Sequence, residues 1–227
     1  MHERGALHAR GALLLMEQGA SDARSGAQRV VLREDGEQPG VLVARFEGFP
    51  LQFVNTLRRI IMRDVQCVAA ESVTFHQSAN AFWDEYIAHR VGLCVVEGAE
   101  GDICLQAENA DAPSRTVYTT DAAAPNDGHS ARFAHRVPLV YLAKGDSLRM
   151  TVHVRRGCGR MHARYAPAVV WHRSDGADAT ALYIQTHGAM RNEEILRVAL
   201  EHVRRMVDRA EREADRPQED RVADRKN

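Results

Sequence analysis

Two segments near opposite ends of the chain have apolar residues at helical spacing. In the first, about 51–64, apolar side chains recur every three or four positions, and arginines fall on the other face. The second covers about 192–212, with Asn192 as the expected N-cap and acidic residues in the first turn that favour the helix dipole. The apolar stripes are Phe53, Val54, Leu57, Ile60 and Ile61 in the first helix, and Ile195, Val198, Ala199, Val203, Met206, Val207 and Ala210 in the second.

The residues between these two helices have a mainly β-like pattern. Alternating apolar residues at 148–154 are typical of a strand with one buried face. A shorter helix is expected at 83–93, a turn or short helix at 138–142, and loop over most of 108–130. The expected strands are 29–33 and 41–46, which form a hairpin around the turn-rich 34–40, then 67–75, short strands up to 104, 115–119, 147–154 and 182–186.

This order of elements indicates an α+β fold. The two best helices lie at opposite ends of the sequence with β-like segments between them, as if a second domain were inserted into the first. One small sheet can cover only part of each apolar stripe. A helix pair from a partner is the expected cover for the rest.

Composition and charge exclude few classes of function. The chain has 227 residues, of which 44% are hydrophobic and 27% charged, as in ordinary globular proteins. A net charge of -1 argues against a protein whose main task is to coat nucleic acid. For Arg58, Arg59 and Arg63, a solvated or partner-facing helix edge is therefore favoured over contacts to phosphate.

Apolar runs and cysteines also indicate the compartment. No apolar run reaches the roughly 18–20 residues of a membrane span, and 12–15 is too short for the core of a signal sequence. An intracellular location is therefore expected. Reduced thiols packed as small hydrophobes are favoured over a zinc site or a disulfide framework, because the cysteines lie far apart, at Cys67, Cys94, Cys104 and Cys158.

Two motifs contain reactive residues without the spacing of an established site. Glu85 and His89 lie four positions apart, as a metal-binding or acid–base pair would, but the first histidine of H-E-x-x-H is missing. A surface or interface contact is the plainer interpretation. Gly157 and Gly159 lie beside basic residues, as in a phosphate cradle, although P-loop spacing is absent and a turn after the strand explains them. No catalytic residue, metal or cofactor is expected.

Three segments resemble the alpha-like RNA polymerase subunits, in particular the archaeal members of that family and the third-largest subunit of eukaryotic polymerase II. The first segment is Asn55-Thr-Leu-Arg-Arg-Ile-Ile-Met-Arg-Asp-Val65. The second is Asp84-Glu-Tyr-Ile-Ala-His-Arg-Val-Gly-Leu93, and the third is Gly157-Cys-Gly-Arg-Met-His-Ala-Arg-Tyr-Ala-Pro167. With the final strand and helix, the resemblance spans about 41–210 in the order of the family.

The resemblance implies a non-catalytic assembly subunit of DNA-directed RNA polymerase. A discontinuous dimerisation domain, made of a sheet and two long helices, would comprise 28–70 and 166–212. An inserted, mainly-β domain would comprise 71–165, between flexible tails at 1–27 and 213–227. The two helices would pack against those of a smaller alpha-like subunit in a four-helix interface. The apolar residues of that interface would be Leu57, Ile61, Ile195, Val198, Val203 and Met206.

The resemblance also implies contacts with the rest of a polymerase. The second-largest catalytic subunit and other small polymerase subunits are expected partners, DNA is expected to be contacted only indirectly, and no membrane partner is expected. The implied contact residues are Asn55, Arg58 and Arg59 for the second-largest subunit, and Glu85, His89 and Arg90 for the docking surface of the inserted domain.

The sequence departs from the family in ways that bear on cofactor and origin. Many relatives have clustered cysteines in the inserted domain for zinc or an iron–sulfur cluster, whereas this chain has no such cluster. It also lacks the separate DNA-binding domain of the bacterial subunit, which points to an archaeal, eukaryotic or large-DNA-virus polymerase. The compact, cysteine-poor form makes a viral origin one hypothesis. The location would be the nucleus in a eukaryote, or the cytoplasm or virion for a virus.

Two other functions are open at this point. The first alternative is a homodimeric, transcription-associated binding module that works outside the polymerase. A metal-dependent hydrolase that uses Glu85 and His89 is a weaker third hypothesis. Capture of a smaller alpha-like subunit, a stoichiometric homodimer, or bound metal with activity would distinguish the three.

Overall fold

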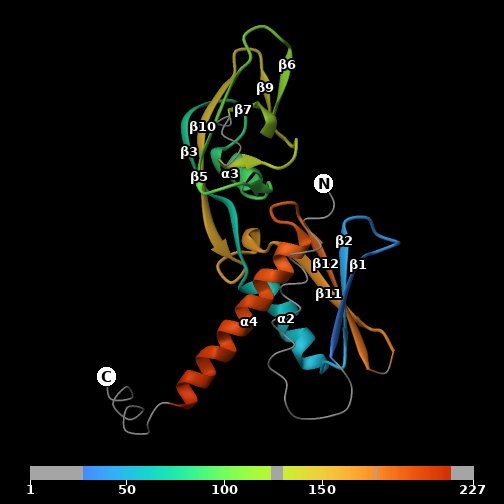
Figure 1. Cartoon of the computed structure of the whole chain (residues 1–227). Helices are drawn as coiled ribbons and strands as arrows, with labels where there is room; N and C mark the ends of the chain where they lie inside the picture. Colours follow the sequence, from blue (N-terminus) through green and yellow to red (C-terminus); the bar gives the residue numbers. More distant parts are fainter. Residues whose placement is uncertain (1–27, 124–129, 177, 216–227) are drawn as a thin grey trace.

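The computed structural model describes residues 28–123, 130–176 and 178–215. Figure 1 shows two sheets, one beside the long helices and one at the other end of the molecule. The first sheet is antiparallel, with the strand order β1-β2-β12-β11. Its strands come from both ends of the described chain, as β1 (Arg29–Glu34), β2 (Val41–Glu47), β11 (Ala168–Ser174) and β12 (Ala179–Thr186).

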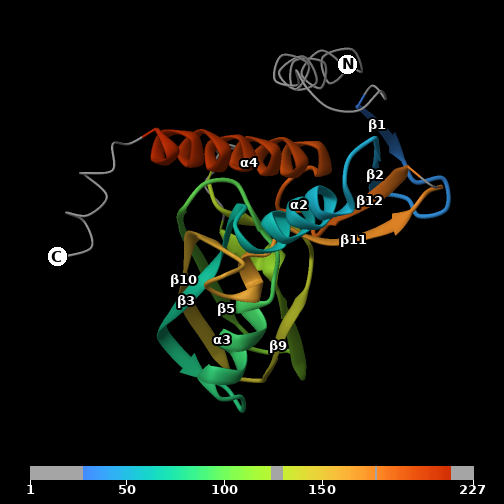
Figure 2. The ribbon, with the colours of Figure 1, turned by 90° about the horizontal axis from the view of Figure 1, so that it is seen from below.

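Helices α2 (Leu51–Arg63) and α4 (Asn192–Ala214) lie on one face of this sheet (Figures 1 and 2). Their apolar residues and the inward-facing strand residues form one hydrophobic cluster. A group of three aromatic rings closes its edge, because Phe49 stacks on Phe53 and meets Phe46 edge to face. Within α2 the buried residues are Val54, Leu57, Ile60 and Ile61, four of the five positions of the expected stripe.

The second sheet has the strand order β3-β10-β5-β7 and forms the centre of the other half. Helix α3 packs against it, and two small two-stranded sheets complete the half. Its elements are β3 (Gln66–Ala79), α3 (Asp84–Gly92), β4 (Val96–Glu97), β5 (Gly101–Glu108), β6 (Ser114–Tyr118), η1 (Thr119–Asp121), β7 (Ala122–Ala123), β8 (Arg132–Phe133), β9 (Pro138–Ala143), β10 (Ser147–Cys158) and η2 (Ala163–Tyr165).

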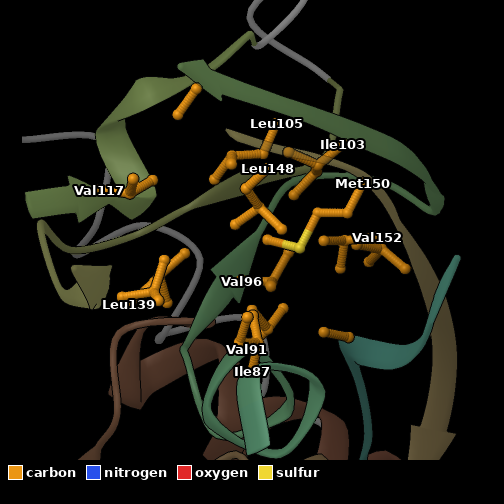
Figure 3. Packing of buried hydrophobic residues seen from close by; sticks show 14 of the residues in the cluster. Ile87, Val91, Val96, Ile103, Leu105, Val117, Leu139, Leu148, Met150 and Val152 are labelled. Atoms are coloured by element: carbon orange, nitrogen blue, oxygen red, sulfur yellow. The ribbon is translucent and has the colours of Figure 1, made fainter. Parts of the chain in front are cut away.

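A separate hydrophobic cluster fills this half. Figure 3 shows Ile87 and Val91 of α3 beneath the side chains of Val96, Leu148 and Met150. Buried and outward-facing residues alternate along β5, and along β10 up to Val154, so that one face of each strand enters this cluster. Since the strand pair β3–β10 begins directly after α2 and runs into this cluster, it joins the two halves.

The α+β fold class is confirmed, and the three expected helices are present within a residue or two of their expected ends. Two separate hydrophobic clusters support the expected division at 28–70 and 166–212 against 71–165, which stays a prediction. The division after residue 70 falls inside strand β3, whose Val68 and Ala70 already belong to the second cluster.

Three local expectations are wrong, and one strand was missed. Residues 138–142 form strand β9 instead of a turn or short helix, and Pro138 takes the first strand position, where no ladder N–H is needed. Strand β11 was not expected. Asn192 is not the N-cap, because Arg191 holds that position and the Asn192 side chain instead accepts from Thr186 N–H at 2.9 Å and donates to Gly40 O at 2.8 Å.

The third correction concerns the cysteines. All four thiols are free, and burial raises the pKa of the Cys67 and Cys94 thiols, as expected for small packed side chains. Cys104, however, is exposed on the outward face of β5. The expected tails at 1–27 and 216–227 lie outside the described residues, and 213–215 continue α4 and its C-cap.

Candidate partner-binding surfaces

Among the described residues, none covers the second half of α4. Ile195, Leu196 and Ala199 are buried in the first turns, but every residue from 204 to 215 is exposed. Met206 is 52% exposed and Val207 50% exposed, although both lie on the apolar stripe. Figures 1 and 2 show this part of α4 extending past the sheet. Isolated helical segments of this length are marginal in water, so an exposed apolar stripe there indicates a partner.

The residues expected at the apolar interface divide into two groups. Leu57, Ile61 and Ile195 are fully buried within this chain, where they belong to the cluster beneath the helices. Val198 and Val203 are half-buried at its margin. Together with Met206, these two are therefore the members of the set that a partner can reach. The other three act as the support beneath them, and the interface itself stays a prediction.

The outward edge of α2 holds the expected polar contact residues. Arg58 Nε donates to Asn55 Oδ1 at 3.1 Å, and Arg58 Nη1 lies 3.7 Å from Met62 Sδ. These contacts hold the Arg58 guanidinium along the helix. Arg59, one position on, is exposed. The edge thus presents two guanidinium groups, one positioned by its neighbours and one free to meet a partner carboxylate.

The third recognisable segment locks the end of α2 to the end of β10. A Cβ placed on Gly159 would lie 1.9 Å from Met62 O, so only glycine allows this approach. Arg160 N–H donates to Arg63 O at 3.0 Å, and the Arg160 guanidinium pairs with the Asp64 carboxylate. The glycine therefore serves close backbone contact, which accounts for it without a phosphate ligand.

The same segment also reaches β3 and α3. Arg164 Nη1 donates to Ala70 O at 2.6 Å and to Glu71 O at 3.1 Å, and it lies 3.1 Å from where a Cβ of Gly92 would be. Ring atoms of Tyr165 lie 2.8 Å from where a Cβ of Gly157 would be. Burial raises the pKa of the Tyr165 hydroxyl. All three recognisable segments thus meet between the two halves.

Helix α3 presents the expected docking residues beside exposed aromatic rings. Glu85 and His89 are both exposed, and Arg90 Nη2 donates to Pro138 O at 2.5 Å. Within the described ranges, no three His, Cys, Asp or Glu side chains come together as metal ligands, and no contact joins Glu85 to His89. The motifs did not identify the apolar part of this surface, formed by Phe82, Trp83, Tyr86 and Leu93, of which Trp83 is 82% exposed.

The signal that could have identified this apolar surface was present in the sequence. Tyr86 and Leu93 lie seven positions apart, on the face that also holds His89, while Ile87 and Val91 mark the buried face.

Nothing in the part of the chain that the structure describes forms a helix long and apolar enough to cross a membrane.

A four-stranded antiparallel sheet, two helices on one of its faces and an uncovered helical stripe define a dimerisation module interrupted by a β-rich insert. Comparison of the sequence with known families gives the same class. The chain belongs to the RNA polymerase Rpb3/Rpb11 dimerisation domain family, whose model matches residues 45–206, more than half of the chain.

Three relatives illustrate the match. The chain is 29% identical over 154 residues to "DNA-directed RNA polymerase subunit Rpo3" of Methanocaldococcus jannaschii, covering 66% of this chain and 78% of the relative. It is 29% identical over 136 residues to the protein of the same name in Thermococcus kodakarensis, and the match covers 56% of this chain and 52% of that relative. It is 26% identical over 153 residues to "DNA-directed RNA polymerases II, IV and V subunit 3" of Arabidopsis thaliana, and the match covers 52% of this chain and 48% of that relative.

These relatives confirm the predicted family, an alpha-like RNA polymerase subunit. The predicted function, a non-catalytic assembly subunit of DNA-directed RNA polymerase, is confirmed at the level of the family, and neither the homodimeric module nor the hydrolase is favoured. The alignment spans about half the length of the second and third relatives. The viral origin stays a prediction.

Proposed function

We propose that this chain pairs with a smaller alpha-like subunit through α4 and α2 and that the pair holds the catalytic subunits of an RNA polymerase. The observation that carries the pairing is the exposed second half of α4, residues 204–215. Membership of a dimerisation family supports it. The relatives also support an intracellular location, nuclear or cytoplasmic.

The apolar residues of the exposed half of α4 have the spacing of a helix–helix seam. Val203, Met206, Val207 and Ala210 recur at three or four positions, which places them on one side of the helix. A second amphipathic helix laid along this side would bury Met206 and Val207. With α2 packed beside α4 on this chain, the proposed pairing with two helices of the partner is a four-helix interface, which membership of the dimerisation family supports.

Two polar surfaces are proposed for the rest of the polymerase. The edge formed by Asn55, Arg58 and Arg59 is assigned to the second-largest catalytic subunit, because its guanidinium groups can form bidentate pairs with carboxylates. The surface of α3, with Glu85 and His89 beside exposed Tyr86, is assigned to docking of another polymerase subunit. Contact with DNA would be only indirect, since a net charge of -1 gives the chain no general basic excess.

Co-expression tests the pairing. The chain is produced with the shortest alpha-like protein encoded in the same genome, and the complex is purified through a tag on that partner. Met206→Glu should abolish co-purification, because it places a charge in the seam. Arg205→Glu introduces the same residue two positions from both Val203 and Val207, on the side of the helix away from the stripe, and should leave co-purification unchanged.

Three outcomes contradict the pairing. Equal capture of both variants would move the interface away from this stripe. A monomer that captures neither a smaller alpha-like subunit nor a large polymerase subunit would remove the scaffold role. A stoichiometric homodimer that Met206→Glu disrupts would favour the homodimeric module instead.

A further inference from the structure

The face of the first sheet that points away from the helices has a cavity that the assembly role does not use. Strand residues that face the helices, such as Leu182 and Ile184, alternate with residues on this opposite face, such as Tyr183. The cavity has a volume of about 260 Å³. It is lined by Arg33, Asp35, Gly36, Glu37, Gln38, Trp171, Arg173 and Tyr183.

One wall of the cavity is a stacked aromatic pair. Trp171 and Tyr183 are opposite one another in the β11–β12 ladder, with ring centroids 5.2 Å apart and an angle of 7° between the rings. The guanidinium of Arg173 lies 5.5 Å from the Tyr183 ring centroid. Because the two rings stack on one another, another planar group can extend the stack on the outer face of either ring.

The opposite wall is the turn between β1 and β2. Asp35 Oδ1 accepts from Glu37 N–H at 3.0 Å, and Asp35 N–H donates to Val41 O at 2.8 Å, which fixes the turn. The Glu37 carboxylate and the Arg33 guanidinium have no ion-pair partner among the described residues. An acceptor and a donor are therefore both available opposite the aromatic pair.

The charges in the cavity select the class of ligand. Arg33 and Arg173 balance Asp35 and Glu37, so a strongly charged ligand gains little from entering. A planar ring with donors beside acceptors uses both kinds of group. Guanine has this pattern, because its O6 and N7 accept from arginine and its N–H groups donate to a carboxylate.

We propose that this cavity binds a guanine base, stacked on the Trp171–Tyr183 pair and held by Arg33 and Glu37. The base comes either from a free guanine nucleotide or from an unpaired guanosine in RNA, since the contacts to the base are the same. The site lies on the face opposite α2 and α4, so its occupancy does not require partner pairing and can be tested separately.

The test uses the fluorescence of Trp171. Trp83→Phe leaves Trp171 as the remaining tryptophan of the 227-residue chain. Titration with GMP should quench its emission saturably, with an affinity about tenfold higher than for AMP, since each well-placed base contact discriminates by about that factor. In the same background, Glu37→Gln and Arg33→Gln should each lower the affinity for GMP about fivefold or more, and Arg149→Gln, on the other sheet, should not.

A second titration distinguishes the two sources of the base. A six-nucleotide uridine RNA with one central guanosine that binds more tightly than GMP, while the all-uridine RNA does not bind, identifies RNA as the source. Equal affinity for GMP and this RNA identifies the free nucleotide. Absence of saturable quenching by either, or equal affinity for GMP and AMP in the Trp83→Phe chain alone, overturns the proposal even where a cavity variant fails to fold.

Discussion

The two halves of the molecule treat their apolar surface differently. In the half around β3, β10 and β5, apolar side chains from α3 and the strands meet in a closed cluster (Figure 3). In the half around β2 and β12, the cluster ends near Ala199 while the apolar stripe of α4 continues to Ala210. The cluster of the first half is thus covered by described elements of that half, while Trp83 and Tyr86 stay exposed outside it. The second has an apolar surface longer than its own sheet, and this difference distinguishes a folding core from an interface.

The largest expected effect tests whether Leu57 belongs to the fold or to the interface. Leu57 is fully buried, so Leu57→Ala should lower the free energy of unfolding by about 3 kcal/mol. Urea denaturation followed by circular dichroism measures this loss. Leu148→Ala, in the other cluster, is the matched variant and should have a similar effect. A loss below about 1 kcal/mol for Leu57→Ala would show that this residue is not part of the core.

A smaller effect is expected at the junction between the halves. Gly159→Ala places a Cβ 1.9 Å from Met62 O, which forces α2 and β10 apart. The free energy of unfolding should fall by about 2 kcal/mol, measured by the same denaturation. Gly36→Ala is the control, since nothing lies within 4 Å of its added Cβ. Equal stability of the two variants would mean that the halves do not depend on this contact.

Almost no effect on the isolated chain is expected from Met206→Ala. Since Met206 is 52% exposed, its truncation should change the free energy of unfolding by less than about 0.5 kcal/mol. The same variant should weaken binding of the smaller alpha-like subunit about tenfold, measured by calorimetry. Comparison with Leu57→Ala sharpens the contrast between the two groups of apolar residues. A Met206→Ala chain that is destabilised but binds the partner normally would assign Met206 to the core instead of the interface.

The smallest effect depends on pH. His153 hydrogen-bonds Asp102 at 2.9 Å and lowers the pKa of that carboxyl below 3.8, with Arg155 adding to the effect. A carboxyl whose pKa is lowered by folding stabilises the folded state above its unfolded pKa, and this contribution is lost as the pH falls through the lowered value. Asp102→Asn should therefore reduce Tm slightly at pH 6, with the difference disappearing as the pH falls through the lowered pKa of Asp102. Asp111→Asn, another exposed aspartate, should show no such dependence.

The sequence predicted the parts of the fold whose pattern is periodic. The stripes of α2 and α4 gave both helices, and the alternation at Leu148, Met150 and Val152 gave β10. Strand β9 was misread because its Leu139 and Val140 are both buried, which breaks the alternation of a strand with one exposed face. The Asn192 side chain was misassigned because its partners, Thr186 N–H and Gly40 O, are brought to it only by the tertiary fold.

The candidate site was predictable in its residues more than in its geometry. The motifs identified Arg58, Gly159 and His89, but no spacing rule indicates that Gly159 touches Met62 O. The apolar stripe of α4 also looks uniform in the sequence. Only the extent of the sheet decides that Ile195 is buried by the chain itself while Met206 is left for a partner.

The pairing of β2 with β12 has a consequence for the order in which the protein folds during synthesis. Val41 lies opposite Gln185, so the first sheet is incomplete until almost the whole described chain has left the ribosome. The β3–β10 half needs only residues up to Tyr165 and can therefore fold earlier. Until β12 has been synthesised, the apolar sides of β2 and α2 stay uncovered. During that interval the nascent chain exposes apolar surface to which a chaperone can bind.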